Sequence, residues 1–402
     1  MMIKISIFLL ALHIATAQKN EGDSCILEYT YSMGKCVRAE SCESAQIDFQ
    51  QNGIRPTFCS YTLTGALVCC RDGGNIFQTP PRAPQTESPV WGNLPPNQQT
   101  DQKRVSERKC EEYSRSVVQT VNFFALVPNP DPMSLSAPKC NYIGVELVVG
   151  GEKASLGEFP HMAAIGWSDS SGGYTFSCGG SLISPRFVLT AAHCTRDTRQ
   201  QNPAPVIVRL GDQNIDPAVR DGANPVEVAI RKIILHPNYK SPIRYNDIAL
   251  LELATDVDFE ENIRPACLWN KHDVSEYKKA IATGWGVTNV RTKETSKDLQ
   301  KVSLSLLNND YCDRLLANSK NRNWNGFVPS QLCAGELRGG KDTCQGDSGS
   351  PLQVASTENQ CIFYLVGIVS FGRECAAPGQ PAVYTRVSSF LDWVESVVWP
   401  GE

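Results

Sequence analysis

Three short strings in the sequence hold side chains that could act together on a carbonyl group. His193 lies in Leu-Thr-Ala-Ala-His-Cys, where an apolar strand end runs into a cysteine that can fix the backbone of a general base. Asp247 enters the apolar run Ile-Ala-Leu-Leu, where burial of its carboxylate is costly unless a donor such as a histidine N–H compensates it. Ser348 lies in Gly-Asp-Ser-Gly, whose small residues let a substrate carbonyl approach the hydroxyl and the backbone N–H groups together.

Each string alone also has an ordinary explanation. A Gly-Asp-Ser-Gly string is a turn in most proteins, and a lone histidine at a strand end is more often a structural residue. Together, the three strings offer the nucleophile, general base and orienting carboxylate of an acyl-transfer enzyme.

The elements around these strings follow a β pattern. After Val148 the chain has many short runs rich in β-branched residues, such as 206–208 and 365–369, separated by Gly, Pro and Asn. This pattern predicts an all-β domain over 148–402. Only the end of this domain differs from the β pattern, because apolar residues from Phe390 onward follow helical spacing. Ser389 stands three residues before an aspartate, the spacing of a helix cap. We expect a C-terminal helix packed on the β body.

The start of the chain is typical of a secretory signal peptide. Lys4 precedes an apolar run over 5–15, and the small residues at 15–17 suit signal peptidase, so we expect the segment 1–17 to be removed. A membrane anchor is the alternative, but the run is shorter than the roughly 20 residues that span a bilayer. We therefore expect a secreted protein that is not held in a membrane.

The chain between the signal peptide and the β domain falls into two parts. Residues 18–71 are polar and contain six cysteines, which predicts a separate small domain that needs crosslinks to fold. Residues 72–147 begin with a Pro-rich stretch that predicts a semi-extended linker, the alternative being a structured Pro-rich ligand. Within this part, apolar positions over 108–124 follow helical spacing and predict one helix.

Composition excludes several classes of protein. The chain has 402 residues, with 38 Lys and Arg against 42 Asp and Glu, and this slightly acidic balance disfavours a nucleic-acid partner. Its 16 cysteines at irregular spacings, with only five histidines, favour disulfides over metal sites and an oxidising compartment. We predict no metal ion.

The order His193, Asp247, Ser348 is that of the chymotrypsin-like serine proteases, and the chain resembles this family from Val148 to about residue 399. The strings Val-Val-Gly-Gly at 148–151 and Gly-Trp-Gly at 284–286 carry the same resemblance. It implies a fold of two six-stranded antiparallel β-barrels with a C-terminal helix. It also implies that Ser348 is the nucleophile, His193 the general base and Asp247 the group that orients the imidazole.

The resemblance implies further site residues. The N–H groups of Gly346 and Ser348 would form the oxyanion hole, and cleavage after Leu147 would free an amino terminus at Val148 that pairs with Asp347. The residues that would bind the substrate side chain are Asp342, at the floor of a pocket for Arg or Lys, and Ser370 and Gly372 at the rim of that pocket. Ala382 stands where the trypsin-like pattern has a second pocket glycine. The methyl group of Ala382 is expected to crowd this pocket.

Family pairing implies most of the disulfides. Within the β domain it would join Cys178 with Cys194, Cys312 with Cys333 and Cys344 with Cys375, and it would tie Cys140 to Cys267. The two cysteines that remain, Cys110 and Cys361, are predicted to pair with each other.

The small N-terminal domain has its own resemblance. Six cysteines that end in the adjacent Cys69 and Cys70 are similar to the clip domain of arthropod haemolymph proteases, a module that precedes a linker and a protease. The family pairing would be Cys25 with Cys69, Cys36 with Cys59 and Cys42 with Cys70, one of fifteen connectivities that spacing alone leaves open. The module is either a solubilising cap or, as we prefer, a docking domain.

The combined resemblance implies a secreted zymogen in a haemolymph immune cascade that leads to melanisation or Toll signalling. Because Leu147 is not basic, the activator is expected to be a chymotrypsin- or elastase-like protease. The enzyme would then cut a downstream zymogen or cytokine precursor after Arg or Lys, under control by a serpin. The alternative is a weak or inactive homologue that acts as a binding cofactor, although its usual mark, a replaced triad residue, is absent; a digestive trypsin is disfavoured by the small domain, the linker and Leu147.

A calcium ion is the one cofactor that the sequence leaves open. Asp212, Asp216 and Asp221 fall in the loop that binds calcium in some chymotrypsin-like relatives, and carboxylate oxygens suit this ion. The length of the loop and the presence of Pro225 make its similarity to that calcium-binding loop less exact. We therefore expect a solvated acidic loop and no cofactor.

Overall fold

The computed structural model describes residues 20–26, 33–42, 44–45, 56–62, 65–70, 103–115, 118–124, 132–138, 140–142 and 152–402, with breaks in the last range at 171, 201, 290–291, 293, 340–342 and 373–376. The chain divides into two compact units, Met1–Asn97 and Gln98–Glu402. The expected signal peptide, the bond after Leu147, Asp342 and Cys375 lie outside the described residues.

The first unit is a four-stranded antiparallel sheet in the order β1-β2-β4-β3, made by β1 (Ser24–Ile26), β2 (Met33–Arg38), β3 (Phe58–Thr62) and β4 (Gly65–Cys70), with a short 3-10 helix η1 (Ala39–Ser41). Its core is little more than Leu67 and buried cysteines. Three disulfides join Cys25 to Cys69, Cys36 to Cys59 and Cys42 to Cys70, the pairs that the clip resemblance implied. A unit with so small an apolar core depends on these crosslinks for its fold.

The second unit begins with the helix α2 (Val105–Ser114), followed by a hairpin of β5 (Val118–Phe124) and β6 (Pro132–Pro138). The predicted helix over 108–124 is therefore wrong in its second half. The run that follows Ser114 is rich in Val, Thr and Phe, and these residues favour a strand once a partner strand is available. Here β6 supplies that partner along the whole length of β5.

The first barrel closes in the order β10-β13-β12-β11-β8-β9 and consists of β8 (Met162–Ser168), β9 (Tyr174–Ser184), β10 (Phe187–Thr190), β11 (Ile207–Leu210), β12 (Val226–Leu235) and β13 (Ala249–Leu253). Alternate side chains such as Ile165, Leu182 and Leu251 point inward and are fully buried in its core. A 3-10 helix, η3 (Ala192–Thr195), follows β10 directly.

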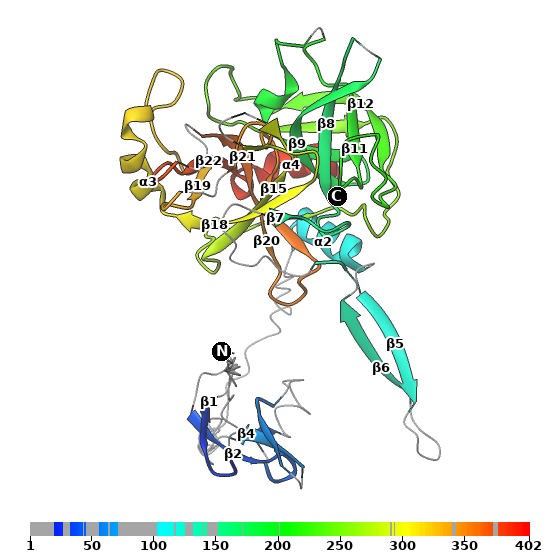
Figure 1. Cartoon of the computed structure of the whole chain (residues 1–402), viewed down its shortest axis with the longest axis vertical. Helices are drawn as coiled ribbons and strands as arrows, with labels where there is room; N and C mark the ends of the chain where they lie inside the picture. The colour runs from blue at the N-terminus through cyan, green and yellow to red at the C-terminus, as the bar shows by residue number, and fades with distance from the viewer. Residues whose placement is uncertain are drawn as a thin grey trace, which may run out of the picture. The chain divides into compact units, whose positions relative to one another are not determined.

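The second barrel closes in the order β21-β20-β15-β18-β19-β22 and consists of β15 (Lys279–Gly284), β18 (Gln300–Leu307), β19 (Gln331–Gly335), β20 (Pro351–Ala355), β21 (Phe363–Phe371) and β22 (Ala382–Arg386). Two short strands extend it, β7 (Glu152–Lys153) against β18 and β14 (Cys267–Leu268) against β21. The strands β16 (Val287–Asn289) and β17 (Glu294–Thr295) form a separate pair. The barrels, green and yellow to orange in Figure 1, lie side by side, which confirms the predicted fold class.

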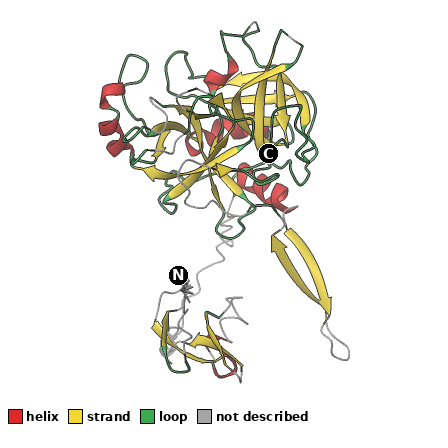
Figure 2. Ribbon diagram, in the orientation of Figure 1, coloured by secondary structure: helices red, strands yellow, loops and turns green. Residues whose placement is uncertain are grey.

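Helices are few beside the strands, as Figure 2 shows. The predicted C-terminal helix is present as η5 (Val387–Phe390) running into α4 (Leu391–Val398), but Phe390 is its N-cap and Ser389 does not cap it. Sequence analysis missed α3 (Asn309–Leu315), whose cap Asn308 accepts hydrogen bonds from two backbone N–H groups, and the short η4 (Ala317–Ser319). Among the helices of the described residues, none combines the length and apolar character needed to cross a membrane.

One apolar cluster joins the two barrels to the C-terminal helix. It contains Leu189 and Leu250 of the first barrel, Leu365 and Ile368 of β21, and Val394 of α4, each almost fully buried. Because residues from both barrels share this cluster, the barrels cannot separate without exposing it. The segments that end at the junction between the barrels are therefore held in fixed relative positions.

The structure corrects two expected disulfides. Cys110 pairs with Cys267 and Cys140 with Cys361, in place of Cys110 with Cys361 and Cys140 with Cys267. The reason is the packing of α2 against β14, which brings the Cα atoms of Cys110 and Cys267 to 5.1 Å from each other. Tyr142, two residues after Cys140, packs on Phe363 and so brings Cys140 to Cys361.

The other disulfides of this unit agree with the family pairing where they are described. Cys178 pairs with Cys194 and Cys312 with Cys333. Cys344 is disulfide-bonded, and its expected partner Cys375 lies outside the described residues. None of the cysteines within the described ranges is a free thiol.

The corrected pairing can be tested by removing cysteines two at a time. In the variant with Cys110→Ala and Cys267→Ala, one whole disulfide disappears, so maleimide labelling of the denatured, unreduced protein should find no free thiol. The variant with Cys110→Ala and Cys361→Ala should instead expose two thiols, those of Cys140 and Cys267. The opposite labelling pattern in the two variants would contradict the pairing.

Candidate active site

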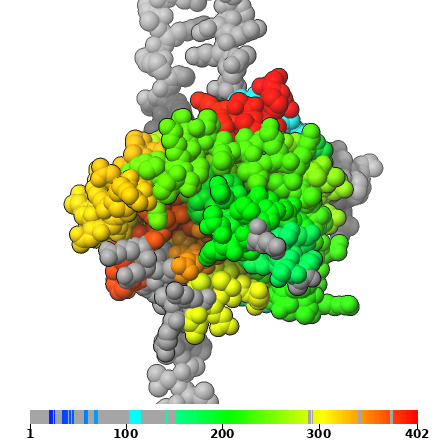
Figure 3. All heavy atoms as spheres, turned by 90° about the horizontal axis from the view of Figure 1, so that it is seen from above, coloured from blue at the N-terminus to red at the C-terminus, as the bar shows by residue number. Residues whose placement is uncertain are grey.

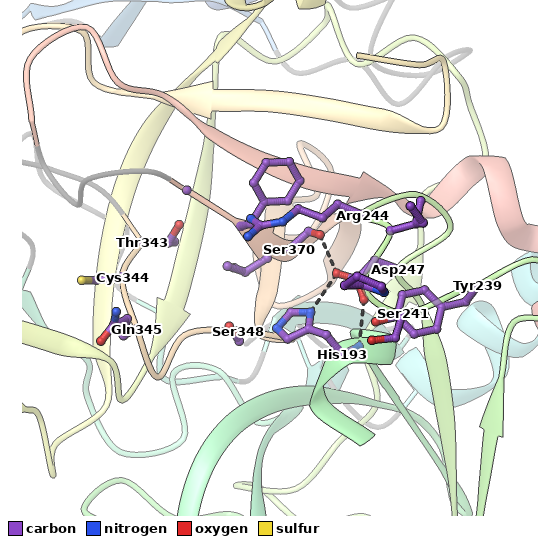
Figure 4. A pocket seen from close by; sticks show the side chains of 15 residues that line it. His193, Tyr239, Ser241, Arg244, Asp247, Thr343, Cys344, Gln345, Ser348 and Ser370 are labelled. Atoms are coloured by element: carbon purple, nitrogen blue, oxygen red, sulfur yellow. Dashed lines mark hydrogen bonds and ion pairs between the residues drawn. The ribbon is translucent and has the colours of Figure 1, made fainter. Parts of the chain in front are cut away.

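The three side chains singled out in the sequence meet where the two barrels adjoin. His193 lies in η3 after β10, Asp247 precedes β13, and Ser348 lies in the turn before β20. All three line one pocket of about 400 Å³. Figure 3 shows the green surface of the first barrel beside the yellow and orange surface of the second, and Figure 4 shows the side chains around the pocket.

The carboxylate of Asp247 is held by donors from both barrels. Its Oδ1 accepts the backbone N–H of His193 at 2.9 Å, and its Oδ2 accepts Nδ1–H of the same residue at 2.8 Å. The Ser370 hydroxyl, on β21, donates to Oδ2 at 2.5 Å. Since a carboxylate only accepts, Nδ1 of His193 carries the hydrogen and Nε2 keeps its lone pair for a proton from elsewhere.

Electrostatics adjust both partners in the direction that a general base requires. Desolvation alone would lower the pKa of His193, but the charge of Asp247 and the hydrogen bond to it outweigh desolvation and raise that pKa above its ordinary 6.5. Burial alone would raise the pKa of Asp247, but His193 and the Ser370 hydroxyl hold it below 3.8. Asp247 therefore stays ionised, and the imidazole is a better proton acceptor than a free histidine.

The turn that carries Ser348 leaves two backbone donors free. Within it, the N–H groups of Asp347, Gly349 and Ser350 donate to carbonyl oxygens of the protein. Among the described residues, the N–H groups of Gly346 and Ser348 donate no hydrogen bond to a backbone carbonyl. These are the two groups that the family resemblance implied for an oxyanion hole, and they are available for a substrate oxygen.

Glycine is required at two positions of this turn. Gly346 and Gly349 have φ angles of +97° and +78°, in the left-handed region that side chains disfavour. A Cβ on Gly349 would also lie 2.2 Å from the Thr190 hydroxyl of the first barrel. The local conformation that exposes Ser348 thus depends on both glycines and on the approach of the neighbouring barrel.

Asp347, beside Ser348, is a buried carboxylate with few donors. It accepts the N–H groups of Gly286 and Cys344, each at 2.9 Å, yet burial raises its pKa to about 6. A Cβ on Gly284 or Gly286 would lie 2.2 to 2.4 Å from atoms of this carboxylate, which explains both glycines of Gly-Trp-Gly. A cation placed here would restore the charged form of the carboxyl group.

The walls of the pocket contain the other expected binding residues. Ser370 and Gly372 line it, and Thr343 at its base bonds to the hydroxyl of Tyr384 at 3.0 Å. Ala382 is buried on β22, and a Cβ built on Gly372 would lie 3.8 Å from its methyl group. The Ala382 methyl group thus lies near the rim residue Gly372 but does not itself line the pocket, and Asp342 lies outside the described residues.

One wall of the pocket was not predicted from the sequence. The pocket is lined on the side of Asp247 by Tyr239, Ser241, Pro242, Ile243 and Arg244. Figure 4 labels Tyr239, Ser241 and Arg244. No motif marks these residues. Their position just before Asp247 in the sequence is the only signal that could have pointed to them.

In the acidic loop, Asp212 is paired with a cation of the protein itself. The guanidinium of Arg209 bonds to the Asp212 carboxylate at 3.3 Å and to the carbonyl of Ile215 at 3.2 Å, so a protein cation already occupies this position. Asp216 and Asp221 each accept a backbone N–H of their own turns. Among the described residues, the groups of potential ligand atoms that converge consist of disulfide cysteines with or without His193, and do not include Asp212.

Comparisons with known proteins agree with this geometry. The family model described as Trypsin matches residues 148–394. Serine protease snk of Drosophila melanogaster is 34% identical over 94% of this chain and 79% of its own length. CLIP domain-containing serine protease B4 of Anopheles gambiae is 33% identical over 76% of this chain and 85% of its own, and the proclotting enzyme of Tachypleus tridentatus is 30% identical over 93% and 90%.

The raised pKa of His193 predicts the pH dependence of peptide hydrolysis. Because protonated His193 cannot act as a base, kcat/KM should rise with pH through a pKa above 6.5. Asp247→Asn removes the charge that raises this pKa while desolvation remains, so the rising limb should move to lower pH and kcat should fall by about 10⁴.

Thr385→Val is the matched control for this experiment. Thr385 donates to the backbone carbonyl of Asp247 at 2.9 Å and not to its carboxylate, so its loss should leave the rising limb in place. A limb that stays unchanged in Asp247→Asn would contradict the assignment.

Proposed function

The chain belongs to the trypsin family of serine proteases, in the group of arthropod clip-domain proteases, and we propose that it is secreted as a zymogen that cleaves other proteins after Arg or Lys. The observation that supports this function best is the bonding of His193 to Asp247 in the pocket that Ser348 lines. An inactive binding homologue gains no such support, because all three side chains are present and placed together.

We propose the following roles in the reaction. Ser348 Oγ attacks the carbonyl carbon of the scissile bond while His193 Nε2 takes its proton, and the N–H groups of Gly346 and Ser348 bind the resulting oxyanion. His193 then gives the proton to the leaving amine, and an acyl-enzyme ester forms at Ser348. Water, activated by the same histidine, hydrolyses this ester. No metal or cofactor takes part in these steps.

Activation is proposed to follow cleavage after Leu147. The described chain resumes at Glu152, and β7 lies beside β18, which in turn pairs with β15 at Gly284. Two such strand spacings are about 10 Å, and the four residues 148–151 that precede Glu152 can span about 13 Å. The amino group of Val148 is therefore within reach of Asp347, which lies against Gly284.

The new amino terminus would supply the cation that Asp347 lacks among the described residues. Burial raises the pKa of this carboxyl to about 6 in the uncut chain, and an adjacent ammonium would favour its charged form and lower that pKa. The pairing would fix the turn that carries Gly346 and Ser348. We propose this pairing as the switch between zymogen and enzyme.

Preference for Arg or Lys is proposed to come from Asp342 at the pocket floor, one residue before Thr343. The pocket rim, Ser370 and Gly372, would pair with an extended substrate by β-strand addition. We propose that the Ala382 methyl group, which lies near the rim residue Gly372, reduces the room for the substrate side chain and so limits turnover or biases the choice between Arg and Lys.

The place of the enzyme in a cascade is proposed from its activation bond and its relatives. Leu147 requires an activator with chymotrypsin- or elastase-like preference, so this protease would not activate itself. One relative is named proclotting enzyme, itself a proenzyme by name, which supports a zymogen that acts in an extracellular cascade. We propose that this chain acts in haemolymph on a protease zymogen or cytokine precursor of a melanisation or Toll pathway, under serpin control.

The activation step can be tested on the full chain. Digestion with an elastase-like protease should produce an amino terminus at Val148 and raise hydrolysis of Arg and Lys peptides by about 100-fold or more, since the oxyanion hole becomes ordered. A trypsin-like protease should not produce this terminus. Asp347→Asn should be cut equally well yet stay inactive. Correct cleavage with no activity on Arg, Lys or Phe peptides would favour the binding-cofactor function.

The effect of Ala382 has a separate test. Ala382→Gly should raise kcat/KM for Arg peptides by about tenfold, because removal of a methyl group from a crowded pocket relieves contact with the substrate side chain. Ala334→Gly, at the cross-strand partner of Ala382, is the control and should leave kcat/KM unchanged. Equal kinetics in the wild type and Ala382→Gly would show that the methyl group does not limit substrate binding.

A further inference from the structure

Arg244 stands between two adjoining pockets. It lines the catalytic pocket and a second pocket of about 380 Å³, and Phe371 and Gly372 line both as well. The remaining lining of the second pocket is apolar or uncharged, from Leu316, Asn318, Ser319, Asn321, Trp324, Pro381 and Val383. Arg244 is therefore the one charged side chain among the described residues that line it.

The guanidinium of Arg244 is held in place but has no counter-ion. Its carbon atom lies 4.4 Å from the centre of the Phe371 ring. The backbone on either side is fixed, because its N–H donates to Asn323 and its carbonyl accepts from the side chain of Gln331. No carboxylate of the described residues lies within 4.0 Å of the guanidinium, whereas Arg104, Arg186 and Arg209 all have such partners.

The nearest candidate counter-ion is already engaged. Asp247, three residues along the chain, is buried and accepts from His193 and Ser370. On the adjoining segment, Arg322 is exposed and adds positive charge, while Asp313 is bonded to Lys320. The side chain of Arg244 itself is exposed, so it can bind a partner from solution.

The orientation of a bound substrate places this cation on one side of the scissile bond. We take the substrate to add as an antiparallel strand along the segment from Ser370 to Gly372. The substrate residue at the scissile bond then lies near Ser370, and the residues that precede it in the substrate lie progressively closer to Gly372 and beyond. The second pocket adjoins Gly372 and the ring of Phe371. Side chains about two to four residues before the scissile bond therefore reach it.

We propose that Arg244 is a specificity-determining residue that selects substrates with Asp or Glu about two to four residues before the scissile bond. This proposal rests on the proposed function, because it takes the cleavage site and strand direction from it. A carboxylate there forms a charge-assisted hydrogen bond with Arg244, whose stacking on Phe371 fixes the geometry. The substrate thus combines a basic residue at the cleavage site with an acidic residue upstream.

The test uses the full chain cut at Val148 and paired peptides that carry Arg at the scissile bond. Each pair differs only by Asp or Asn at the second, third or fourth residue before that bond. Wild type should show a kcat/KM about tenfold higher for the Asp peptide at one of these positions, and this ratio should fall at high salt. Arg244→Ala should bring the ratio to one, and Arg244→Glu should favour Lys over Asp there.

Arg314→Ala is the matched control. Arg314 is also an exposed arginine stacked on an aromatic ring, 5.8 Å from the centre of Tyr311, but it lines neither pocket. Its removal should leave the preference for Asp unchanged. Equal rates for Asp and Asn peptides in the wild type, or loss of the preference in Arg314→Ala as well, would overturn the proposal.

Failure of the proposed function gives a different result. In that case the cut wild-type chain hydrolyses no peptide with Arg at the scissile bond, whatever residue stands upstream. The role of Arg244 is then decided by binding, measured as fluorescence anisotropy of the same labelled peptides with the cut Ser348→Ala chain. The proposal is supported if the Ser348→Ala chain binds the Asp peptide more tightly than the Asn peptide and the double variant Ser348→Ala, Arg244→Ala does not. Equal binding of the two peptides by the Ser348→Ala chain overturns it.

Discussion

A single buried carboxylate sets the requirements for the rest of the active site. Asp247 can remain ionised at the junction of the barrels only because three donors converge on it, two from His193 and one from Ser370. The first two come from the N-terminal barrel and the third from the C-terminal barrel. The barrels must therefore pack in one relative position, and the apolar cluster that joins Leu189, Ile368 and Val394 holds them there.

A second buried carboxylate shows the opposite balance. Asp347 has two backbone donors and no described cation, so burial dominates and raises its pKa to about 6, whereas the pKa of Asp247 is lowered. The contrast gives each group a separate role. Asp247 has its donors within the fold, whereas Asp347 has too few donors to offset its burial, which suits the proposed pairing with a new amino terminus.

Arginines in this protein differ in the same way. Arg104 and Arg209 are each bonded to carboxylates within the fold, where they tie α2 to α4 and complete the acidic loop. Arg244 is fixed by stacking on Phe371 and by its backbone, but its charge is directed to a pocket with no acidic group among its described lining. Such a pattern suits recognition rather than stability, since an exposed cation contributes little to the fold.

The sequence by itself determined the fold class and the candidate site residues His193, Asp247 and Ser348, because each of the three lies in a short string that is recognisable from its own residue types. The resemblance to clip domains implied the pairing within the small domain, which cysteine spacing alone leaves open, but the pairing implied for Cys110 and Cys140 was wrong. Those two cysteines lie on segments whose partners are chosen by the packing of α2 on β14 and of Tyr142 on Phe363. The prediction of a helix over 108–124 was wrong in its second half for the same reason. The apolar spacing there did not distinguish helix from strand, and pairing with β6 makes it the strand β5. Only the tertiary structure could place Arg244 between two pockets, because stacking on Phe371, more than a hundred residues away in the chain, leaves no pattern in the local sequence.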